Sequence, residues 1–203
     1  MWENRDVPFM TLPSHLQQLA FHWPWRDYQA RVLAAIDAHL DDNRLHIVAA
    51  PGSGKTVLGL EVMRRLARPA LVLSPTRTIR NQWLERLRDF LPEGTEWPLA
   101  WTSADLETPA FFTSVTYQAL HSQSRAEAEQ PEEESAEEAD ELEKAPGSGE
   151  LKAVVARLKA AGVGTLILDE AHHLRAEWWK ALIKLVEALP GIKVVSLTAT
   201  PPY

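Results

Sequence analysis

The sequence predicts an α/β domain in which a mostly parallel β-sheet is covered by helices on both faces. Two observations lead to this prediction. Apolar runs of strand length alternate along the 203 residues with longer amphipathic segments at helical spacing. The predicted strands are apolar throughout rather than at alternate residues, which is typical of strands buried on both faces of a doubly wound sheet. The pattern leaves the order of the strands open.

Each predicted element follows from a local pattern. In the first helix, apolar residues recur every three to four positions from Tyr28 to Leu40, and Asp41-Asp42-Asn43 favours the turn that ends it. The first strand is an apolar run that breaks at Pro51 and Gly52. By the same criteria, helices are predicted over 25–40, 55–67, 78–90, 117–121, 151–161 and 177–189, and strands over 45–50, 70–73, 111–115, 165–168 and 194–197.

The composition excludes several classes of protein. With 45% hydrophobic and 24% charged residues, the chain has the composition of an ordinary globular domain. It has no cysteine, which excludes disulfide scaffolds, cysteine zinc sites, iron–sulfur clusters and thiol nucleophiles. The polar start of the chain has no signal-peptide core behind it, and no apolar run is long enough to span a membrane. We therefore expect a cytoplasmic protein of a prokaryote, or one that is otherwise intracellular, with no membrane partner.

The domain organisation follows from periodicity and charge. Residues 1–24 have weak periodicity and are predicted as a lead-in to a domain over 25–203, which an acidic insertion interrupts at 122–150. The insertion holds 11 of the 28 acidic and 2 of the 21 basic residues, so its charge is −9 and that of the remainder is +2. It is predicted to be disordered or a frayed helix, because it has too little apolar surface to bury. A solvated linker is the simplest interpretation; a regulatory or partner-binding segment, including one that mimics a nucleic-acid backbone, is the alternative.

A glycine-rich loop joins the first strand to the second helix. In Ala49-Ala-Pro-Gly-Ser-Gly-Lys-Thr56 the glycines let successive backbone N–H groups point at phosphate oxygens, and the following helix adds the positive end of its dipole. Lys55 is suited to reach the β- and γ-phosphates and act in catalysis, and the Thr56 hydroxyl to bind Mg²⁺. The loop matches a P-loop except that Ala49 replaces the first glycine. A glycine-rich turn with a surface lysine is the alternative, which the strand–loop–helix context disfavours. The remaining nucleotide-binding candidates in the loop are Pro51, Gly52, Ser53 and Gly54.

Two adjacent carboxylates follow the strand predicted over 165–168. Asp169 and Glu170 are expected at the strand's carboxyl end, where α/β sheets bind ligands. Opposite the P-loop threonine, Asp169 is suited to hold Mg²⁺ through water, and Glu170 to orient and deprotonate an attacking water. Such a pair alone is more often structural, but together with a P-loop it favours catalysis. His172 and His173 point to different faces of one element, which makes them a poor metal-binding pair.

Five motifs, in this order, resemble those of the N-terminal motor domain of a superfamily 2 helicase. They are Arg26-Asp-Tyr-Gln29, Ala50-Pro-Gly-Ser-Gly-Lys-Thr56, Ser74-Pro-Thr-Arg77, Asp169-Glu-Ala-His172 and Ser196-Leu-Thr-Ala-Thr200. The last two are most similar to those of the DEAH-type branch that holds type I and III restriction translocases and related DNA-repair helicases. The resemblance runs from Trp25 to the C-terminus. It implies a RecA-like P-loop NTPase domain with ATP and Mg²⁺ as cofactors.

The resemblance assigns roles to residues near the first two strands. Arg26 and Gln29 match a motif that recognises adenine, and a glutamine amide has the donors and the acceptor to bond an adenine edge. An exposed helix start is the alternative for Gln29. Thr76 and Arg77 match a segment that grips a nucleic-acid phosphate. A solvated surface position is the alternative for Arg77.

Further roles are implied near the later strands. Tyr117 and Gln118 resemble a second nucleic-acid contact, because Thr-Tyr-Gln is familiar at that point of the family. His172, Thr198 and Thr200 resemble elements that couple the state of ATP to the grip on nucleic acid, with the threonine hydroxyls bonded to the Asp-Glu-Ala-His segment. A polar strand end is the alternative for the two threonines.

Tryptophan is abundant, at eight residues, but most of it is not expected to stack on bases. Trp83 follows the apolar pattern of its helix and is predicted to lie in the core. The adjacent Trp178 and Trp179 cannot both face inward, so one is expected at the surface or at an interface. Trp97 and Trp101 are the better candidates for base stacking.

The chain ends where, in the family that it resembles, a second RecA-like domain follows with the remaining motifs and an arginine finger. Such a finger contributes about 10³–10⁵ in rate in related chemistry. We therefore expect this chain alone to bind Mg-ATP weakly, to hydrolyse it slowly or not at all, and not to unwind nucleic acid. A domain cut from a longer motor is the favoured interpretation, and a short protein whose partner subunit supplies the second half is the alternative.

The predicted function is thus the ATP-binding motor domain of a helicase or translocase. Its expected partner is nucleic acid, with DNA favoured over RNA only by the branch that the motifs resemble. A non-catalytic binding module, in which ATP switches affinity for nucleic acid or protein, is the alternative. Glu170 disfavours that alternative, because a pure switch needs no carboxylate to activate water. A general P-loop kinase would leave Gln29 and the Thr-Ala-Thr motif unexplained.

Overall fold

The computed structural model of the chain describes residues 18–96, 99–125, 151–171, 174 and 176–199. In these residues six strands form one sheet, and every pair of neighbouring strands is parallel. Their order is β1-β6-β5-β2-β4-β3. The strands are β1 (Arg44–Val48), β2 (Ala70–Ser74), β3 (Thr102–Ser103), β4 (Phe112–Thr116), β5 (Thr165–Asp169) and β6 (Lys193–Thr198). The predicted α/β class with a parallel sheet is confirmed.

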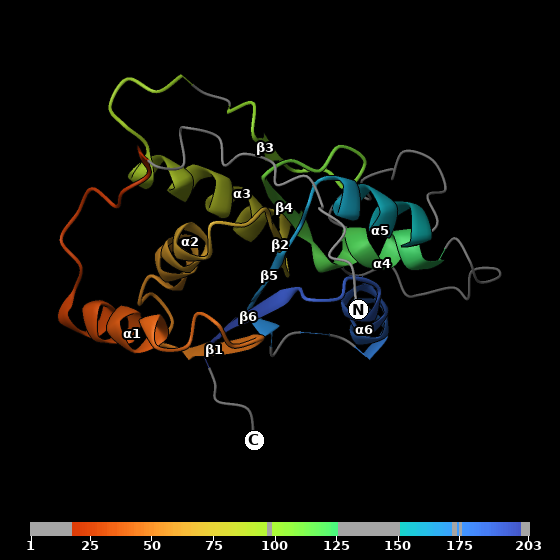
Figure 1. Cartoon of the computed structure of the whole chain (residues 1–203), viewed down its shortest axis with the longest axis horizontal. Helices are drawn as coiled ribbons and strands as arrows, with labels where there is room; N and C mark the ends of the chain where they lie inside the picture. Colours follow the sequence, from red (N-terminus) through yellow and green to blue (C-terminus); the bar gives the residue numbers. More distant parts are fainter. Residues whose placement is uncertain (1–17, 97–98, 126–150, 172–173, 175, 200–203) are drawn as a thin grey trace, which may run out of the picture.

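Helices cover both faces of this sheet (Figure 1). The helices are α1 (Asp27–Asp37), α2 (Lys55–Leu66), α3 (Arg77–Arg86), the 3₁₀ helix η2 (Leu87–Phe90), α4 (Tyr117–Arg125), α5 (Leu151–Ala160) and α6 (Ala176–Ala188). α1 to α3 share one core cluster with alternate strand residues, and α4 to α6 share a second with the residues between them. In β2, for example, Val72 belongs to the first cluster and Leu73 to the second. None of the helices in the described ranges is both long and apolar enough to cross a membrane.

The strands differ in burial according to their place in the sheet. All residues of β2, β4 and β5 are buried, because these strands lie inside the sheet with helices on both faces. β1 lies at an edge, and only its Leu45 and Ile47 are buried. Both belong to the cluster under α1 to α3, whereas no residue of β1 belongs to the opposite cluster. The prediction of a fully buried first strand is therefore wrong, because one face of β1 lacks a covering helix.

Two helices and one strand differ most from the prediction. The helix predicted over 78–90 divides into α3 and the tighter η2. α4 continues to Arg125, inside the segment predicted as an acidic insertion, and the rest of that segment, 126–150, lies outside the described residues. The two-residue strand β3 has no apolar run that would predict it.

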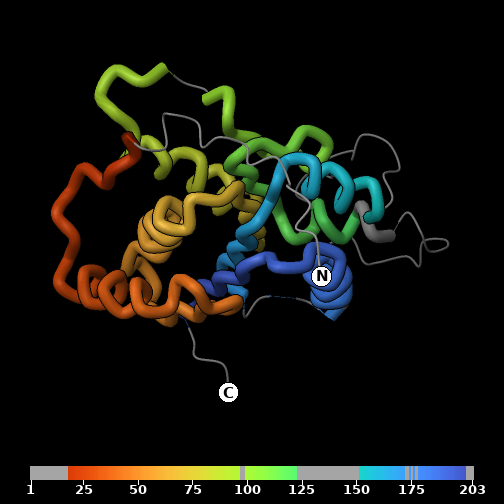
Figure 2. Tube along the Cα trace, in the orientation of Figure 1, coloured from red at the N-terminus to blue at the C-terminus, as the bar shows by residue number. Residues whose placement is uncertain are grey.

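The described part of the predicted lead-in packs on the domain. The backbone N–H groups of Ala20 and His22 donate to the carbonyls of Phe90 and Asp89 at 3.0 and 3.1 Å. Figure 2 shows this segment running from the region beside the end of α3 to the start of α1. Residues 18–24 are therefore tied to the folded domain.

The topology brings the ends of β1 and β5 to one place. The chain leaves β1, passes over β6 and β5 as helix α2, and returns as β2. Since all strands are parallel, their carboxyl ends share one edge, at which Val48 pairs with Thr198 and Asp169 pairs with Leu197. The start of α2 is thus carried from the end of β1 toward the end of β5. A crevice at such a switch point is where α/β sheets bind ligands.

Candidate nucleotide-binding site

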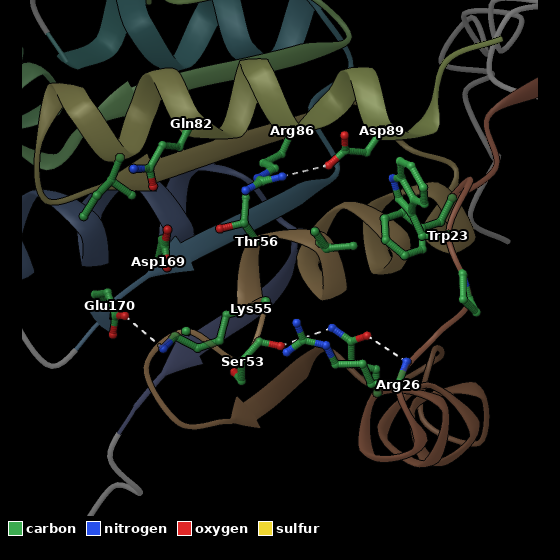
Figure 3. Close-up of a pocket in the computed structure, with 17 residues that line it drawn as sticks. Trp23, Arg26, Ser53, Lys55, Thr56, Gln82, Arg86, Asp89, Asp169 and Glu170 are labelled. Carbon is green, nitrogen blue, oxygen red and sulfur yellow. Dashed lines mark hydrogen bonds and ion pairs between the residues drawn. The ribbon is translucent and has the colours of Figure 1, made fainter. Parts of the chain in front are cut away.

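A pocket of about 530 Å³ opens at this edge of the sheet (Figure 3). Its size is in the range of small-molecule and cofactor sites. We refer to it as the nucleotide pocket. It is lined by Phe21, Trp23, Pro24, Arg26, Gln29, Gly52, Ser53, Gly54, Lys55, Thr56, Val57, Ile79, Gln82, Arg86, Asp89, Asp169 and Glu170. Most of the nucleotide-binding and catalytic residues predicted from the sequence, which lie far apart along the chain, are therefore brought together here; Pro51 belongs to the same loop but does not line the pocket.

The loop before α2 has the backbone of a phosphate cradle. Gly52 and Gly54 adopt φ angles of 71° and 86°, in the left-handed region that glycine tolerates best. A Cβ added to Gly54 would lie 2.8 Å from Nε2 of Gln29, so this position excludes a side chain for a second reason. Ala49, which replaces the usual first glycine, donates its N–H to the carbonyl of Thr198 at 3.0 Å. It therefore extends the sheet, where alanine is accommodated.

Lys55 and Glu170 face each other across the nucleotide pocket (Figure 3). The Nζ of Lys55 lies 3.0 Å from Oε1 of Glu170, and the two side chains are 8% and 22% exposed. Lys55 also donates to the carbonyl of Ala49 at 3.3 Å. Thr56 follows in the first turn of α2 and lines the same pocket. A lysine held near both the loop and a carboxylate is suited to exchange that carboxylate for a phosphate oxygen.

Asp169 is the last residue of β5 and is 3% exposed. Its Oδ2 accepts a hydrogen bond from the indole N–H of Trp83 at 2.7 Å. Burial raises the pKa of the Asp169 carboxyl, and the Trp83 hydrogen bond offsets this only in part. The nearby Glu170 raises the same pKa further, whereas Lys55 lowers it. The carboxylate thus depends on its donors to remain charged in a buried position.

Glu170 has an unusual backbone. Its φ angle is 50°, in the left-handed region, although it is not a glycine. Such a conformation costs about 1–3 kcal/mol and is found preferentially at functional sites. It occurs directly after β5 ends, and the side chain meets the Lys55 ammonium. The strained backbone therefore occurs at the residue that is predicted to activate water.

Gln29 links α1 to the phosphate loop. Its Oε1 accepts from the N–H of Arg26, and its Nε2 donates to the carbonyl of Ser53, both at 3.1 Å. The side chain is 5% exposed, so Gln29 is not a solvated helix start. An amide has two N–H donors and an acceptor with two lone pairs, and these two bonds leave one of each for a ligand. Arg26 is exposed at the rim of the nucleotide pocket.

A partly buried ion network centred on Glu61, which the sequence analysis did not predict, fixes α1 against α2. Arg65 donates to Glu61 at 2.8 Å and to the carbonyl of Leu33 at 2.9 Å, and lies 2.6 Å from Asp37. Arg64 also bonds Glu61, at 2.7 Å. Burial tends to raise the pKa of Glu61, but the bonds from the two arginines outweigh it and hold that pKa below its ordinary value. The network keeps the helix that carries Gln29 in register with the helix that begins at the P-loop.

The residues predicted to contact nucleic acid lie at the ends of the neighbouring strands β2 and β4. We call Thr76, Arg77, Tyr117 and Gln118 the strand-end row. Thr76 is exposed and caps α3, since its hydroxyl accepts from the N–H of Ile79 at 3.2 Å. Arg77 is half-buried and Gln118 is exposed. None of the four lines the nucleotide pocket.

The structure corrects the prediction for Tyr117. Its ring is 1% exposed and stacks on Trp178 with the centroids 5.9 Å apart. Its hydroxyl donates to the backbone carbonyl of Asp169 at 3.0 Å. Burial, together with the charges of Asp169 and Glu170, raises the pKa of Tyr117. Because the helix turns its first residue toward the core and Gln118 toward solvent, Tyr117 supports the acidic strand end and has no surface to offer a nucleic acid.

The predicted coupling residues are described only in part. Thr198 is buried at the end of β6, and its carbonyl accepts from the Ala49 N–H. This bond connects the end of β6 to the start of the phosphate loop. His172 and Thr200 lie outside the described residues.

The tryptophans mostly follow the expectation. Trp83 is buried in the core, and of the adjacent pair Trp178 is partly buried while Trp179 is 51% exposed. Trp101 is half-buried with its ring edge-on to Phe111 at 6.4 Å, which leaves less of it for base stacking than predicted. Trp97 lies outside the described residues.

The donor set suits Mg²⁺ held largely by a nucleotide. In the described part of the chain, no group of three or more His, Cys, Asp or Glu side chains is arranged to hold a metal ion. Mg²⁺ is usually bound by one or two protein oxygens together with phosphates and waters, rather than by an all-protein cage. Thr56 and Asp169 line one pocket with Lys55 and fit that requirement.

The parallel sheet, the glycine loop with a lysine at the start of α2, and the acidic end of β5 define a RecA-like nucleotide-binding domain. The family model described as "Type III restriction enzyme, res subunit" matches residues 22–203, so the chain belongs to this family. It is an ATP-binding motor domain of the superfamily 2 helicase type, which confirms the inferred resemblance at the level of the superfamily.

Individual similar proteins are considerably longer than this chain. UvrABC system protein B of Bordetella petrii is 32% identical over 89 residues, which are 43% of this chain and 13% of that protein. The helicase domain of Pyrococcus furiosus Hef has the same fold, with a TM-score of 0.56 and 18% identity over 88% of this chain and 33% of the other. The Type ISP restriction-modification enzyme LlaGI, solved with a DNA substrate mimic, gives a TM-score of 0.53 and 18% identity over 89% of this chain and 18% of the other.

Proposed function

We propose that this domain binds Mg-ATP in the nucleotide pocket as the first motor domain of a DEAH-type helicase or translocase. In this proposal it couples ATP hydrolysis to movement along nucleic acid when paired with a second RecA-like domain. One observation carries the proposal: Lys55, Asp169 and Glu170, from two distant motifs, meet in one pocket with Thr56 and the phosphate loop.

The loop and the start of α2 would bind the phosphates. The backbone N–H groups around Gly52 and Gly54 and the N-terminus of α2 supply partial positive charge. Lys55 adds a full positive charge that offsets part of the negative charge of the β- and γ-phosphates. Thr56 and Asp169 would hold Mg²⁺, which when bound neutralises charge that develops on the transferred phosphoryl group. Gln29 retains one donor and one lone pair with which to bond the adenine edge.

Glu170 would orient the attacking water and accept its proton. In the structure its carboxylate pairs with the Lys55 ammonium at 3.0 Å. When Lys55 turns to a phosphate, the carboxylate is released for a water molecule in the same pocket. The proposed base, Glu170, and the proposed phosphate-binding lysine, Lys55, are therefore paired with each other before the nucleotide binds.

Nucleic acid is the proposed partner, with DNA preferred over RNA. LlaGI, which shares the fold, was solved with a DNA substrate mimic. The chain outside residues 122–150 carries a charge of +2, which does not oppose a polyanion. Thr76, Arg77 and Gln118 remain the candidate contacts, and the second domain would supply the arginine finger and the opposite wall of the ATP site. His172, Thr198 and Thr200 remain candidates for coupling the two activities.

ATP hydrolysis with and without single- and double-stranded DNA tests the proposal. The chain alone should bind Mg-ATP and hydrolyse it slowly, and a longer protein that includes the second domain should be stimulated by DNA. Glu170→Gln should lower hydrolysis by at least about 100-fold with binding retained, since the water-activating base is lost. Hydrolysis unaffected by Glu170→Gln would contradict the assigned role. A longer protein in which ATP alters DNA affinity without hydrolysis would favour the non-catalytic binding module.

A further inference from the structure

Trp83 makes a contact that its predicted role as a core residue does not require. Its side chain is fully buried, yet its only polar atom points at a carboxylate oxygen of Asp169 at 2.7 Å. The two residues are 86 positions apart in the sequence. We propose that Trp83 is a positioning residue: its indole N–H holds Oδ2 of Asp169 so that the other carboxylate oxygen is presented to Mg²⁺. The inference rests on the proposed function of the pocket.

The chemistry of both partners makes this bond strong. An indole offers one donor and no acceptor, and a buried indole N–H needs a partner. A carboxylate is the strongest acceptor available, because a bond to a charged group is about twice as strong as a neutral one. Asp169 is itself 3% exposed, so water cannot replace the donor readily. Losing the bond would leave a buried charged oxygen unsatisfied.

Packing fixes the direction of the indole. A Cβ added to Gly59 of α2 would lie 2.4 Å from the Cη2 of Trp83 and 2.9 Å from a methyl group of Leu197. Gly59 therefore lets the indole lie against the backbone of the helix that begins at the P-loop. On another side the ring meets Phe112, with centroids 6.5 Å apart. The ring is held between α2 and the sheet and has one orientation in which to donate.

In this arrangement Trp83 is the hydrogen-bond partner that orients the proposed metal ligand Asp169. Such partners fix the rotation of a ligating side chain, and their loss typically weakens metal binding by about 10–100-fold. Figure 3 shows Asp169 and Thr56 on the pocket side of the helix that carries Gln82, the neighbour of Trp83. The proposed metal ligand at the end of β5 and the helix α3 are therefore joined by a single buried hydrogen bond.

The test compares three variants of the chain for ATP binding at several Mg²⁺ concentrations and in EDTA. Trp83→Phe keeps an aromatic ring and removes the donor. Incorporation of 3-benzothienylalanine at position 83 keeps the shape of the indole and replaces the N–H by sulfur, so a folded protein without the donor is available. Leu87→Ala is the control for loss of core packing. Leu87 is fully buried in the same core cluster as Trp83, and its side chain has no hydrogen-bond donor.

Both changes at position 83 should raise the Mg²⁺ concentration needed for half-maximal ATP binding about tenfold, and leave ATP binding in EDTA within twofold of the wild type. Leu87→Ala should lower stability and keep the wild-type dependence on Mg²⁺. Two variants at position 83 that behave like Leu87→Ala, or that lose ATP binding in EDTA to the same degree, would overturn the inference. Failure of the wild type to bind Mg-ATP would instead overturn the proposed function.

Discussion

The nucleotide pocket and the strand-end row lie along the same edge of the sheet, but their side chains are engaged differently. In the pocket, Lys55, Asp169 and Gln29 are each less than one-tenth exposed. Their side chains contact Glu170, the Trp83 indole N–H and the Ser53 carbonyl, respectively. In the row, Thr76 and Gln118 are exposed. A site whose partners belong to the chain itself is formed before its ligand arrives. A surface that meets an external polymer takes its final geometry only with that polymer.

This difference sets the size of the expected effects. Buried charge pairs act in a medium of low polarity and are little screened by salt, whereas exposed charges are weakened by it. Changes in the pocket should therefore be large and insensitive to salt. Changes at the exposed residues of the row should be small and depend on ionic strength.

A large effect on the pocket backbone is expected for Gly54→Ala. Alanine at a φ angle of 86° is strained, and its Cβ would lie 2.8 Å from Nε2 of Gln29. We expect Mg-ATP affinity to fall at least about tenfold, because the cradle and its bond to Gln29 both shift. Gly94→Ala is the matched control, since Gly94 has a φ angle of 80° with nothing within 4 Å of the added Cβ. Isothermal titration of both variants decides the point: equal affinities would mean that the loop geometry is irrelevant to binding.

A smaller and salt-dependent effect is expected for Arg77→Ala. If Arg77 contacts one phosphate, DNA affinity should fall several-fold and the slope of log affinity against log salt should decrease by about one. Lys184→Ala, at an exposed position on α6, controls for the loss of one positive charge. Fluorescence anisotropy with labelled DNA at several salt concentrations measures both quantities. The same slope for the two variants would remove Arg77 from the proposed contact.

Tyr117→Phe separates support from contact within the row. It removes the hydrogen bond to the Asp169 carbonyl, which should cost about 1 kcal/mol of unfolding free energy and lower Tm by roughly 2–4 °C. DNA affinity should not change directly, because the ring is buried. Gln118→Ala should do the reverse, weakening DNA binding with Tm retained. A DNA-binding defect in Tyr117→Phe with normal Tm would restore the original prediction for Tyr117.

The smallest effect concerns acid stability. The pKa of Glu61 is held below its ordinary value of 4.5, so its contribution to stability is complete above that pH and is lost as pH falls through the lower folded-state pKa. Glu61→Gln should therefore reduce the unfolding free energy at pH 7 and flatten its decline below about pH 4.5. Urea unfolding between pH 3 and 7 measures this, with exposed Glu85→Gln as the charge control. An unchanged slope would show that the arginine bonds do not stabilise the folded protein.

Much of the fold and of the nucleotide pocket could be predicted because their signals are local. An apolar run predicts β5 wherever it pairs, and a glycine-rich loop followed by Lys55 and Thr56 has one well-known use. The contacts that orient these residues could not be predicted in the same way. Trp83 reads as an ordinary apolar position of its helix, and only the packing of α3 on α2 shows that its N–H meets Asp169.

The predictions for Tyr117 and for the first strand were wrong because the same local pattern occurs at both buried and exposed positions. Thr-Tyr-Gln suggested an exposed contact, but the first turn of α4 points Tyr117 into the core and Gln118 outward. The first strand has a continuous apolar run, and its place at the sheet edge leaves Val48 exposed. The bonds from Arg65 to Leu33 and Asp37 depend on how α1 packs on α2, which no local pattern indicates.

The most direct test of the account is calorimetric titration of the wild-type chain and of Lys55→Ala with ATP in the presence of Mg²⁺. The Lys55 ammonium contacts both the Ala49 carbonyl, at the start of the phosphate loop, and the Glu170 carboxylate. The wild type should bind one ATP per chain, and Lys55→Ala should bind at least about 100-fold more weakly with unchanged circular dichroism, since a charge-assisted bond to phosphate is lost. Equal binding by the two proteins, or none by the folded wild type, would contradict the assignment of this pocket to ATP.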